Sequence, residues 1–264
     1  MNRWIRGWVI ALIAVLAVQA LAQTTQTTVD VPTRPGVTLR LLVLTPPEPK
    51  AAVILFTGGD GGLQMLPDGG LKRGGGNFLV RSRQLFADQG LMVAVIDAPS
   101  DRQSAPFLSG FRQTPDHVAD VKAVMAWLRT QTRVPVWLVG TSRGTQSAAH
   151  VAVELAGGAD GPDGVVLTST ILTEDKGRPV TAMALGKLRI PVLVVHHEQD
   201  GCRLCSFSDM PLLMDKLTNA PRKQLLTFKG GNNVGDPCEA VAYHGFNGLE
   251  KDVVSQTAAW VLAK

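Results

Sequence analysis

Five residues in the middle of the chain carry its clearest chemical signal. They read Gly-Thr-Ser-Arg-Gly from Gly140 to Gly144, so Ser142 has a glycine two positions away on each side. A buried apolar run at 134–139 precedes them, and a helical pattern at 145–156 follows. A serine on such a sharp strand-to-helix turn exposes its hydroxyl at the carboxyl end of the strand. Glycine is needed at the two flanking positions because side chains there would collide with nearby backbone. Because the turn exposes its hydroxyl, we expect Ser142 to be a nucleophile.

The serine needs a base that removes its proton and an acid that orients that base. In chains with this kind of turn the acid follows the serine and the histidine comes last. Asp200 lies just beyond an apolar run at 190–195, which places it on the same edge of the sheet as Ser142. Glu198 is its nearest competitor, and Asp97 also ends a strand but precedes the serine. We expect Asp200 to be the acid.

The expected base is His244, in the loop between the last predicted strand and the last predicted helix. Gly245 follows it and lets the chain turn sharply. His196 and His197, at the end of a predicted strand, are the alternative bases. The two remaining histidines are on predicted helices and are expected at the surface or the edge of the core: His117 and His150.

An oxyanion hole needs two backbone N–H groups directed at the charge that develops on the substrate oxygen. We expect one from Arg143, the residue after the serine, and the other from the glycine-rich loop 57–62. Either Gly59 or Asp60 is the predicted donor in that loop, where glycines let the backbone approach a substrate closely. The alternative interpretation is a loop that is only flexible.

Strands and helices alternate along the chain, which predicts a mostly parallel sheet with helices on both faces. The expected strands are 24–31, 37–45, 51–56, 91–96, 134–139, 164–168, 190–195 and 223–228. The expected helices are 77–89, 115–129, 145–156, 210–217 and 249–262. Segment 169–189 is too short to hold a cap domain, and we therefore expect one α/β domain over residues 23–264.

These motifs resemble the α/β-hydrolase superfamily over nearly the whole chain from residue 23. They are most similar to its small cap-less members, the dienelactone-hydrolase-like and esterase-like proteins, which share a His-Gly-Phe segment like that at 244–246. The resemblance implies the α/β-hydrolase fold and a triad of Ser142, Asp200 and His244. Thr57 stands where lipase-type proteins have histidine before the oxyanion glycines. Dienelactone hydrolases use cysteine as nucleophile, so a dienelactone substrate is not implied.

The sequence thus predicts an exported serine hydrolase that cleaves an ester or related acyl bond of a small molecule through an acyl-enzyme, with no cofactor and no metal. A peptidase of the same fold and a non-catalytic binding protein on a hydrolase scaffold are the alternatives. Three apolar residues after strand 91–96 are expected either to line an acyl pocket or to belong to the core: Phe107, Leu108 and Phe111. The sequence indicates neither the substrate nor the oligomeric state.

The charge of the chain excludes one class of partner. The formal net charge is +4, and Arg3 and Arg6 in the apolar N-terminal segment supply two of these charges. The remaining basic residues form no block and are not interleaved with aromatic residues, the pattern typical of a nucleic-acid surface. We therefore expect no nucleic-acid partner.

The three cysteines lie in the last quarter of the chain, and an exported protein permits one disulfide among them. Cys202 lies two residues after the expected acid and Cys238 six before the expected base. If acid and base touch, a bridge between these two is geometrically plausible and is our prediction. Cys205–Cys238 is second, and Cys202–Cys205 is third because so short a ring gains little stability. A thioredoxin-like pair would follow the first strand, so redox function is disfavoured.

The first 22 residues are predicted to be a cleaved signal peptide. Arg3 and Arg6 form a positive start, 8–18 is an apolar core, and Ala20-Leu21-Ala22 fits the small-residue cleavage rule. We expect a periplasmic or secreted protein with no membrane attachment, and N-terminal sequencing of it should begin at Gln23. A full-length product in the membrane fraction would instead support the alternative, an uncleaved anchor.

Overall fold

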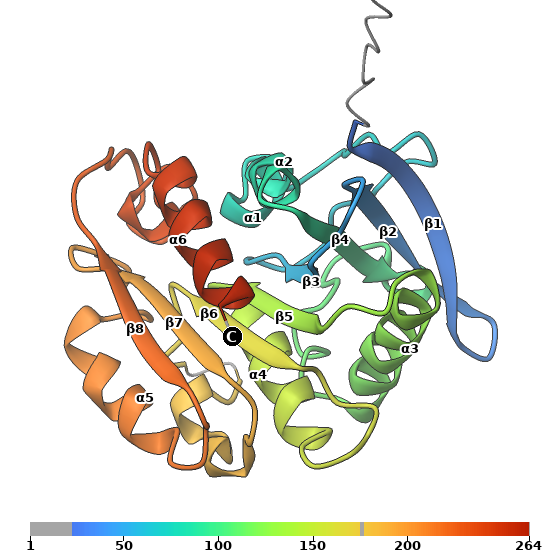
Figure 1. The fold of residues 1–264 in the computed structure, drawn as a ribbon. Coiled ribbons are helices and arrows are strands. Elements are labelled where there is room, and N and C mark those ends of the chain that lie inside the picture. The colour runs from blue at the N-terminus through green and yellow to red at the C-terminus, as the bar shows by residue number, and fades with distance from the viewer. Residues whose placement is uncertain (1–22, 175–176, 264) are drawn as a thin grey trace, which may run out of the picture.

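The computed structural model describes residues 23–174 and 177–263, and the predicted signal peptide lies outside them. Eight strands form one sheet (Figure 1). They are β1 (Thr25–Arg34), β2 (Val37–Thr45), β3 (Ala51–Phe56), β4 (Leu91–Pro99), β5 (Val136–Thr141), β6 (Gly164–Thr168), β7 (Val192–His197) and β8 (Lys223–Phe228). Their spatial order is β1-β2-β4-β3-β5-β6-β7-β8. β2 pairs antiparallel with β1 and β4, and the other neighbours are parallel. The sheet is thus mostly parallel, as the sequence predicts.

The described residues form six α-helices, three on each face of the sheet (Figure 1). One face carries α1 (Phe78–Arg81), α2 (Arg83–Asp88) and α6 (Glu250–Leu262). The other carries α3 (Pro115–Gln131), α4 (Gly144–Glu154) and α5 (Met210–Lys216). Successive side chains of a strand point to opposite faces, so β5 supplies Val136 and Leu138 to one core and Trp137 and Val139 to the other. Two apolar cores therefore hold the central strands rigidly between them.

Strand register aligns the carboxyl ends of the central strands. Phe56 of β3 pairs with Gly140 of β5, and Thr141 of β5 pairs with Thr168 of β6. Thr168 in turn pairs with Val195 of β7. The loops that follow these strands therefore leave the sheet at the same edge, where ligands bind in open α/β sheets.

The helix predicted at 77–89 is wrong as one element, because it breaks into α1 and α2 at Ser82 (φ −92°, ψ 0°). The start of α3 is as predicted: the Thr114 hydroxyl accepts the His117 N–H, and Pro115 occupies the first helical position. Between β6 and β7 the described residues form only two short 3-10 turns, Val180–Ala182 and Leu185–Lys187. That connection carries no cap domain. Within residues 23–174 and 177–263, no helix combines the length and apolarity needed to cross a membrane.

His117 is buried within the core, so its expected place at the surface or the core edge is wrong. His150 lies at the core edge, as expected: it is buried, and its Nδ1 lies 3.9 Å from the carboxylate of the exposed Glu154. The His117 ring lies edge-on to Phe56 and Phe111, with centroids 6.2 and 5.7 Å away. Neither of its ring nitrogens has a hydrogen-bond partner among the described residues. Burial, with the nearby Arg112 charge, lowers the pKa of His117 to about 3. The imidazole is therefore a neutral core ring at physiological pH.

Phenylalanine in place of His117 tests this assignment. The unfolded chain, with an ordinary histidine pKa, binds a proton between about pH 6.5 and 3 that the folded chain does not bind. The free energy of unfolding of the wild type therefore decreases as the pH is lowered below about 6.5, by roughly 2 kcal/mol from this group at pH 5. His117→Phe should lose correspondingly less stability over that interval in urea unfolding. Equal pH slopes in the two proteins would contradict a neutral, buried His117.

Candidate active site

The turn between β5 and α4 places Ser142, half-buried, in a strained conformation at the edge of a pocket. Ser142 has φ +52°, in the left-handed region that L-residues seldom adopt. A Cβ on Gly140 would lie 2.5 Å from the Gly144 carbonyl oxygen, and one on Gly144 would lie 2.0 Å from the Phe56 carbonyl oxygen. The two glycines are therefore required by backbone contacts, for the reason that the sequence analysis gives. The Ser142 N–H donates to the Thr168 carbonyl (3.0 Å), which joins the turn to β6.

Asp200 and His244 form a buried hydrogen-bonded pair. His244 Nδ1 lies 2.8 Å from Asp200 Oδ2, and the Cys202 N–H donates to Asp200 Oδ1 (2.9 Å). The two residues come from loops that follow neighbouring strands, β7 and β8. With Nδ1 bonded to the carboxylate, Nε2 is the nitrogen left to exchange a proton. The structure therefore gives His244 an orienting carboxylate, as a general base requires.

Backbone contacts hold His244 on its short 3-10 turn, Tyr243–Gly245. The Ser169 hydroxyl donates to the His244 carbonyl (2.6 Å), and the Arg81 guanidinium donates to the Gly245 carbonyl (2.6 Å). A Cβ on Gly245 would lie 2.0 Å from the Ala240 carbonyl oxygen. Gly245 is thus needed for close backbone approach, which is a different reason from the sharp turn expected of it.

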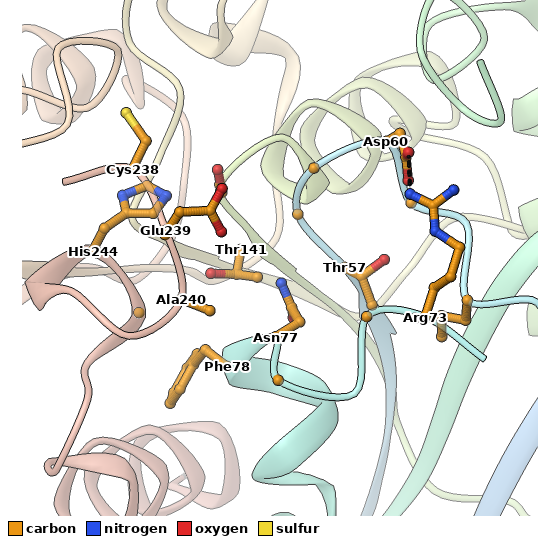
Figure 2. A pocket seen from close by; sticks show the side chains of 18 of the residues that line it. Thr57, Asp60, Arg73, Asn77, Phe78, Thr141, Cys238, Glu239, Ala240 and His244 are labelled. Carbon is orange, nitrogen blue, oxygen red and sulfur yellow. Dashed lines mark hydrogen bonds and ion pairs between the residues drawn. The ribbon is translucent and has the colours of Figure 1, made fainter. Parts of the chain in front are cut away.

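Ser142 and His244 line one pocket of about 510 Å³. Figure 2 shows His244, Glu239 and Cys238 on one side of it and the Asp60–Arg73 ion pair (2.7 Å) on the other. His244 Nε2 is buried and has no hydrogen-bond partner within the described part of the chain, so no Ser142–His244 bond is formed. Such bonds are often long in enzymes without substrate and tighten when substrate binds. The three predicted triad residues therefore lie in one site. The Asp200–His244 hydrogen bond is present, and the Ser142–His244 hydrogen bond is not.

The glycine-rich loop after β3 forms the opposite wall of this pocket. Gly58 lies nearest the serine: a Cβ built on it would be 3.0 Å from Ser142 Cβ. Gly59 and Asp60, the predicted oxyanion donors, line the pocket with Gly58. Arg143 directly precedes α4, and its N–H donates to no acceptor in the described residues. Gly58 is not among the donors predicted from the sequence, because its closeness to Ser142 depends on the packing of α4 against β3.

Asp97 and Glu198, the alternatives to Asp200 as the acid, are bonded to other groups. The buried Asp97 carboxylate accepts N–H groups from Leu63, Met65 and Ala98 at 2.7–2.8 Å, which attaches the segment just after the glycine-rich loop to β4. Glu198 pairs with Lys229 (2.9 Å). Neither carboxylate contacts His244.

The alternative bases belong to the structure around β7. His196 Nε2 lies 2.8 Å from the Cys205 carbonyl oxygen, and burial lowers the pKa of His196. His197 Nε2 lies 2.9 Å from the Gly230 carbonyl oxygen, and its ring stacks on Tyr243 at 4.3 Å. Neither residue lines the pocket that contains Ser142.

The three apolar residues after β4 belong mainly to the core. Phe107, Leu108 and Phe111 form a small buried cluster with Ala98. Leu108 also lines a second pocket of about 430 Å³ on the other side of the Gly59–Asp60 turn, together with Arg143. Neither phenylalanine lines either pocket. Of the two expected roles, acyl pocket or core, Phe107 and Phe111 therefore have the core role.

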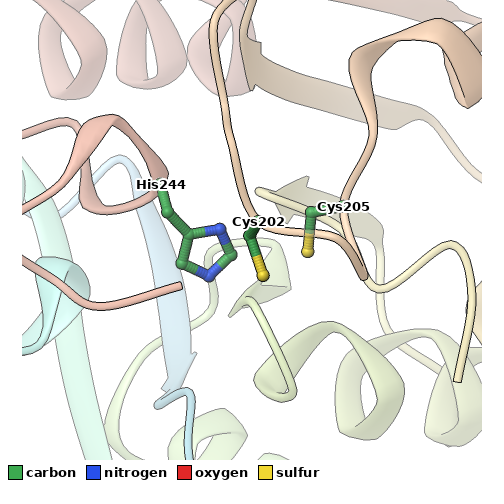
Figure 3. A group of neighbouring side chains, drawn as sticks. All are labelled: Cys202, Cys205 and His244. Carbon is green, nitrogen blue, oxygen red and sulfur yellow. The ribbon is translucent and has the colours of Figure 1, made fainter. Parts of the chain in front are cut away.

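The cysteines lie directly behind the base. The structure joins Cys202 and Cys238 in a disulfide, with Cα atoms 4.5 Å apart. Cys205 is a buried thiol, and burial raises its pKa. Figure 3 shows Cys202, Cys205 and His244 together, with ligand atoms all within 4.8 Å of one another. This group is a poor metal site as it stands, because metals bind thiolates and the Cys202 sulfur is in the disulfide.

Neither a family model nor a curated protein matches the sequence. Solved structures match over most of its length. A dienelactone hydrolase from Anabaena variabilis is 16% identical, with 91% of this chain and 96% of that chain covered and a TM-score of 0.59. An esterase from Pyrococcus furiosus is 12% identical (90% and 92% covered, TM-score 0.62). A serine hydrolase without lid from Xanthomonas campestris is 16% identical (89% and 95%, TM-score 0.54). The chain therefore has the α/β-hydrolase fold without a cap.

The disulfide is open to a direct test. Peptide mapping of non-reduced protein should yield one linked pair of peptides, containing Cys202 and Cys238, and Cys205 should react with alkylating reagents only after unfolding. Closing a loop of 36 residues is worth about 3–4 kcal/mol in the chain-entropy model. Cys238→Ser should therefore unfold at lower urea concentration. Three free thiols in exported protein would contradict the pairing.

Proposed function

We propose that this protein is an exported serine hydrolase that cleaves a carboxylic ester or related acyl bond. The observation that carries the proposal is the buried Asp200–His244 hydrogen bond in the site where the β5–α4 turn presents Ser142. Structural similarity to esterases and a dienelactone hydrolase adds support at the level of the fold. The disulfide is consistent with an oxidising compartment, which supports export.

In the proposed first half-reaction, His244 Nε2 takes the proton of Ser142 Oγ as Oγ bonds to the substrate carbonyl carbon. The carbonyl oxygen becomes an oxyanion, and Asp200 stabilises the imidazolium that forms. The oxyanion accepts hydrogen bonds from Arg143 N–H and from the loop after β3. His244 then gives its proton to the leaving oxygen, the ester C–O bond breaks and an acyl-enzyme remains.

The second half-reaction uses the same groups in the reverse order. His244 removes a proton from water, whose oxygen bonds to the acyl carbon of the acyl-enzyme. Collapse of this second tetrahedral intermediate breaks the bond to Ser142 Oγ, which recovers the proton from His244. The products are a carboxylic acid and the alcohol released earlier, and the residues return to their starting protonation states.

Single substitutions test the three roles. We expect Ser142→Ala to lower kcat on the order of 10⁶-fold and to remove labelling by a fluorophosphonate probe, with the fold unchanged. His244→Ala should be nearly as severe, and Asp200→Asn should cost about 10⁴-fold because the imidazole loses its orientation. Glu198→Gln is the matched control, since its carboxylate is on the same loop but pairs with Lys229. A larger loss in Glu198→Gln than in Asp200→Asn would transfer the acid role to Glu198.

Two other functions remain to be separated from this one. A non-catalytic binding protein would not react with the fluorophosphonate probe. A peptidase of the same fold would react with it and would also cleave aminoacyl amides. Purified protein assayed on acyl esters of increasing chain length beside aminoacyl amides distinguishes the two enzymes, and we expect hydrolysis of esters.

A further inference from the structure

Arg112 is a buried cation beside the candidate site. It is 5% exposed and lies in the segment that leads into α3. Its guanidinium donates to the carbonyls of Thr57 (3.0 Å) and Gly59 (3.1 Å) and to the Ser147 hydroxyl on α4 (3.0 Å). Among the described residues, Arg112 Nε has no hydrogen-bond partner, and the Arg112 side chain forms no ion pair. All its acceptors are thus neutral, which is costly for a buried charge.

The two loop carbonyls that Arg112 binds belong to the loop that faces Ser142. Thr57 C=O is part of the peptide unit that carries the Gly58 N–H, and Gly59 C=O is part of the unit that carries the Asp60 N–H. The only cis peptide bond among the described residues is Ala105–Pro106, so both units are trans. In a trans peptide the N–H points away from the C=O. The N–H groups of Gly58 and Asp60 therefore point away from Arg112.

The side away from Arg112 is the side of the serine. Arg112 lines the pocket of about 430 Å³, and Ser142 lines the other pocket, of about 510 Å³. Gly59 and Asp60 line both, so the loop is the wall between them. None of the N–H groups of Gly58, Gly59 and Asp60 donates to an acceptor in the described residues. The loop thus offers unused donors to the serine side while its carbonyls are bound from behind.

A cation at the carbonyl end of a peptide unit also changes the N–H at the other end. Hydrogen bonds in a chain polarise one another, and in a low-dielectric interior this effect is larger than in water. Burial, with the nearby Arg143 charge, lowers the pKa of Arg112 to about 9. The guanidinium therefore remains charged at neutral pH. Asp60 does not neutralise it by direct contact, because the Asp60 carboxylate binds Arg73 and the Gly62 N–H.

We propose that Arg112 is a positioning residue for the oxyanion site, one that holds and polarises the peptide units whose Gly58 and Asp60 N–H groups face the serine. This inference rests on the proposed acyl hydrolysis. It makes Gly58 and Asp60, rather than Gly59, the loop donors that act with Arg143 N–H. Gly61 is part of the same arrangement: a Cβ there would lie 2.6 Å from the Arg112 guanidinium, so only glycine leaves room for the clamp.

The test compares three variants with the wild type, each purified as the exported, disulfide-bonded protein. Arg112→Met keeps the length of the side chain and removes its charge and donors. Arg112→Lys keeps the charge but loses the planar fork, whose Nη2 donates to both carbonyls while Nη1 donates to Ser147. Arg129→Met is the matched control, because Arg129 also donates to backbone carbonyls, of Asp160 and Gly161, at a position outside both pockets. Each variant is assayed for hydrolysis of p-nitrophenyl acetate and for binding of phenylboronic acid. The boronic acid bonds to the serine hydroxyl and forms a tetrahedral anion that mimics the tetrahedral intermediate.

We expect Arg112→Met to lower kcat about tenfold to 100-fold with KM changed less than about threefold, somewhat less than the loss of an oxyanion donor itself. The Kd of phenylboronic acid should rise by a similar factor, since it depends on the same donors. Arg112→Lys should recover part of the loss. Arg129→Met should keep the kcat and phenylboronate Kd of the wild type even if its melting temperature falls.

Three results would overturn the inference. One is folded Arg112→Met with kcat within about threefold of the wild type, which is too small an effect for lost transition-state stabilisation. Another is a change confined to KM, and the third is an equal loss in Arg129→Met. If Arg112→Met does not fold, Arg112→Lys provides the test. An unchanged kcat and an unchanged Kd of phenylboronic acid in Arg112→Lys would contradict the inference, whereas a lower kcat with a parallel rise in that Kd would support it. A wild type that neither hydrolyses esters nor reacts with the fluorophosphonate probe would instead refute the proposed function.

Discussion

A backbone contact between the start of α4 and the end of β3 is the constraint on which the site depends. A Cβ at Gly144 would lie 2.0 Å from the Phe56 carbonyl oxygen, so the helix packs on the strand at a distance that only glycine permits. This contact places Ser142 beside Gly58 and the glycine-rich loop. It also holds Ser142 at φ +52°, a conformation that costs roughly 1–2 kcal/mol and persists only where surrounding structure imposes it. The two apolar cores supply that rigidity.

The histidine half of the site is held differently. His244 is part of a long connection between β8 and α6 that has little regular structure. Its turn is attached by single contacts to several separate segments: Ser169 after β6, Arg81 of α1, Asp200 after β7 and the Cys202–Cys238 bridge. Phe246, which follows this turn, is buried against Phe78 and Phe228, with ring centroids 5.0 and 6.1 Å away. The serine is thus placed by packing, and the histidine by cross-loop bonds together with the packing of Phe246.

Charge is distributed in a way that suits the proposed reaction. Three acidic groups around the site have partners of their own: Asp97 accepts the N–H of Leu63, just after the glycine-rich loop, Glu198 pairs with Lys229, and Asp60 pairs with Arg73. Asp200 is the one that contacts His244, where positive charge develops. Arg112 lies behind the loop where negative charge develops. A fixed anion and a fixed cation at the two ends of a growing dipole stabilise the transition state without reorganisation.

Local signals in the sequence determined the elements and the order of the site residues. Glycine spacing identifies the β5–α4 turn, Thr114 and Pro115 mark the start of α3, and alternating apolar runs indicate the parallel sheet, because each signal depends on residues a few positions apart. The tertiary structure decided what depends on distant partners. Gly58 lies against Ser142 because α4 packs on β3. His117 is buried because Phe56 and Phe111 meet around it. Arg112 faces the carbonyls of Thr57 and Gly59, more than fifty positions earlier in the chain. No periodicity or motif records such contacts, since only the folded sheet brings those segments together.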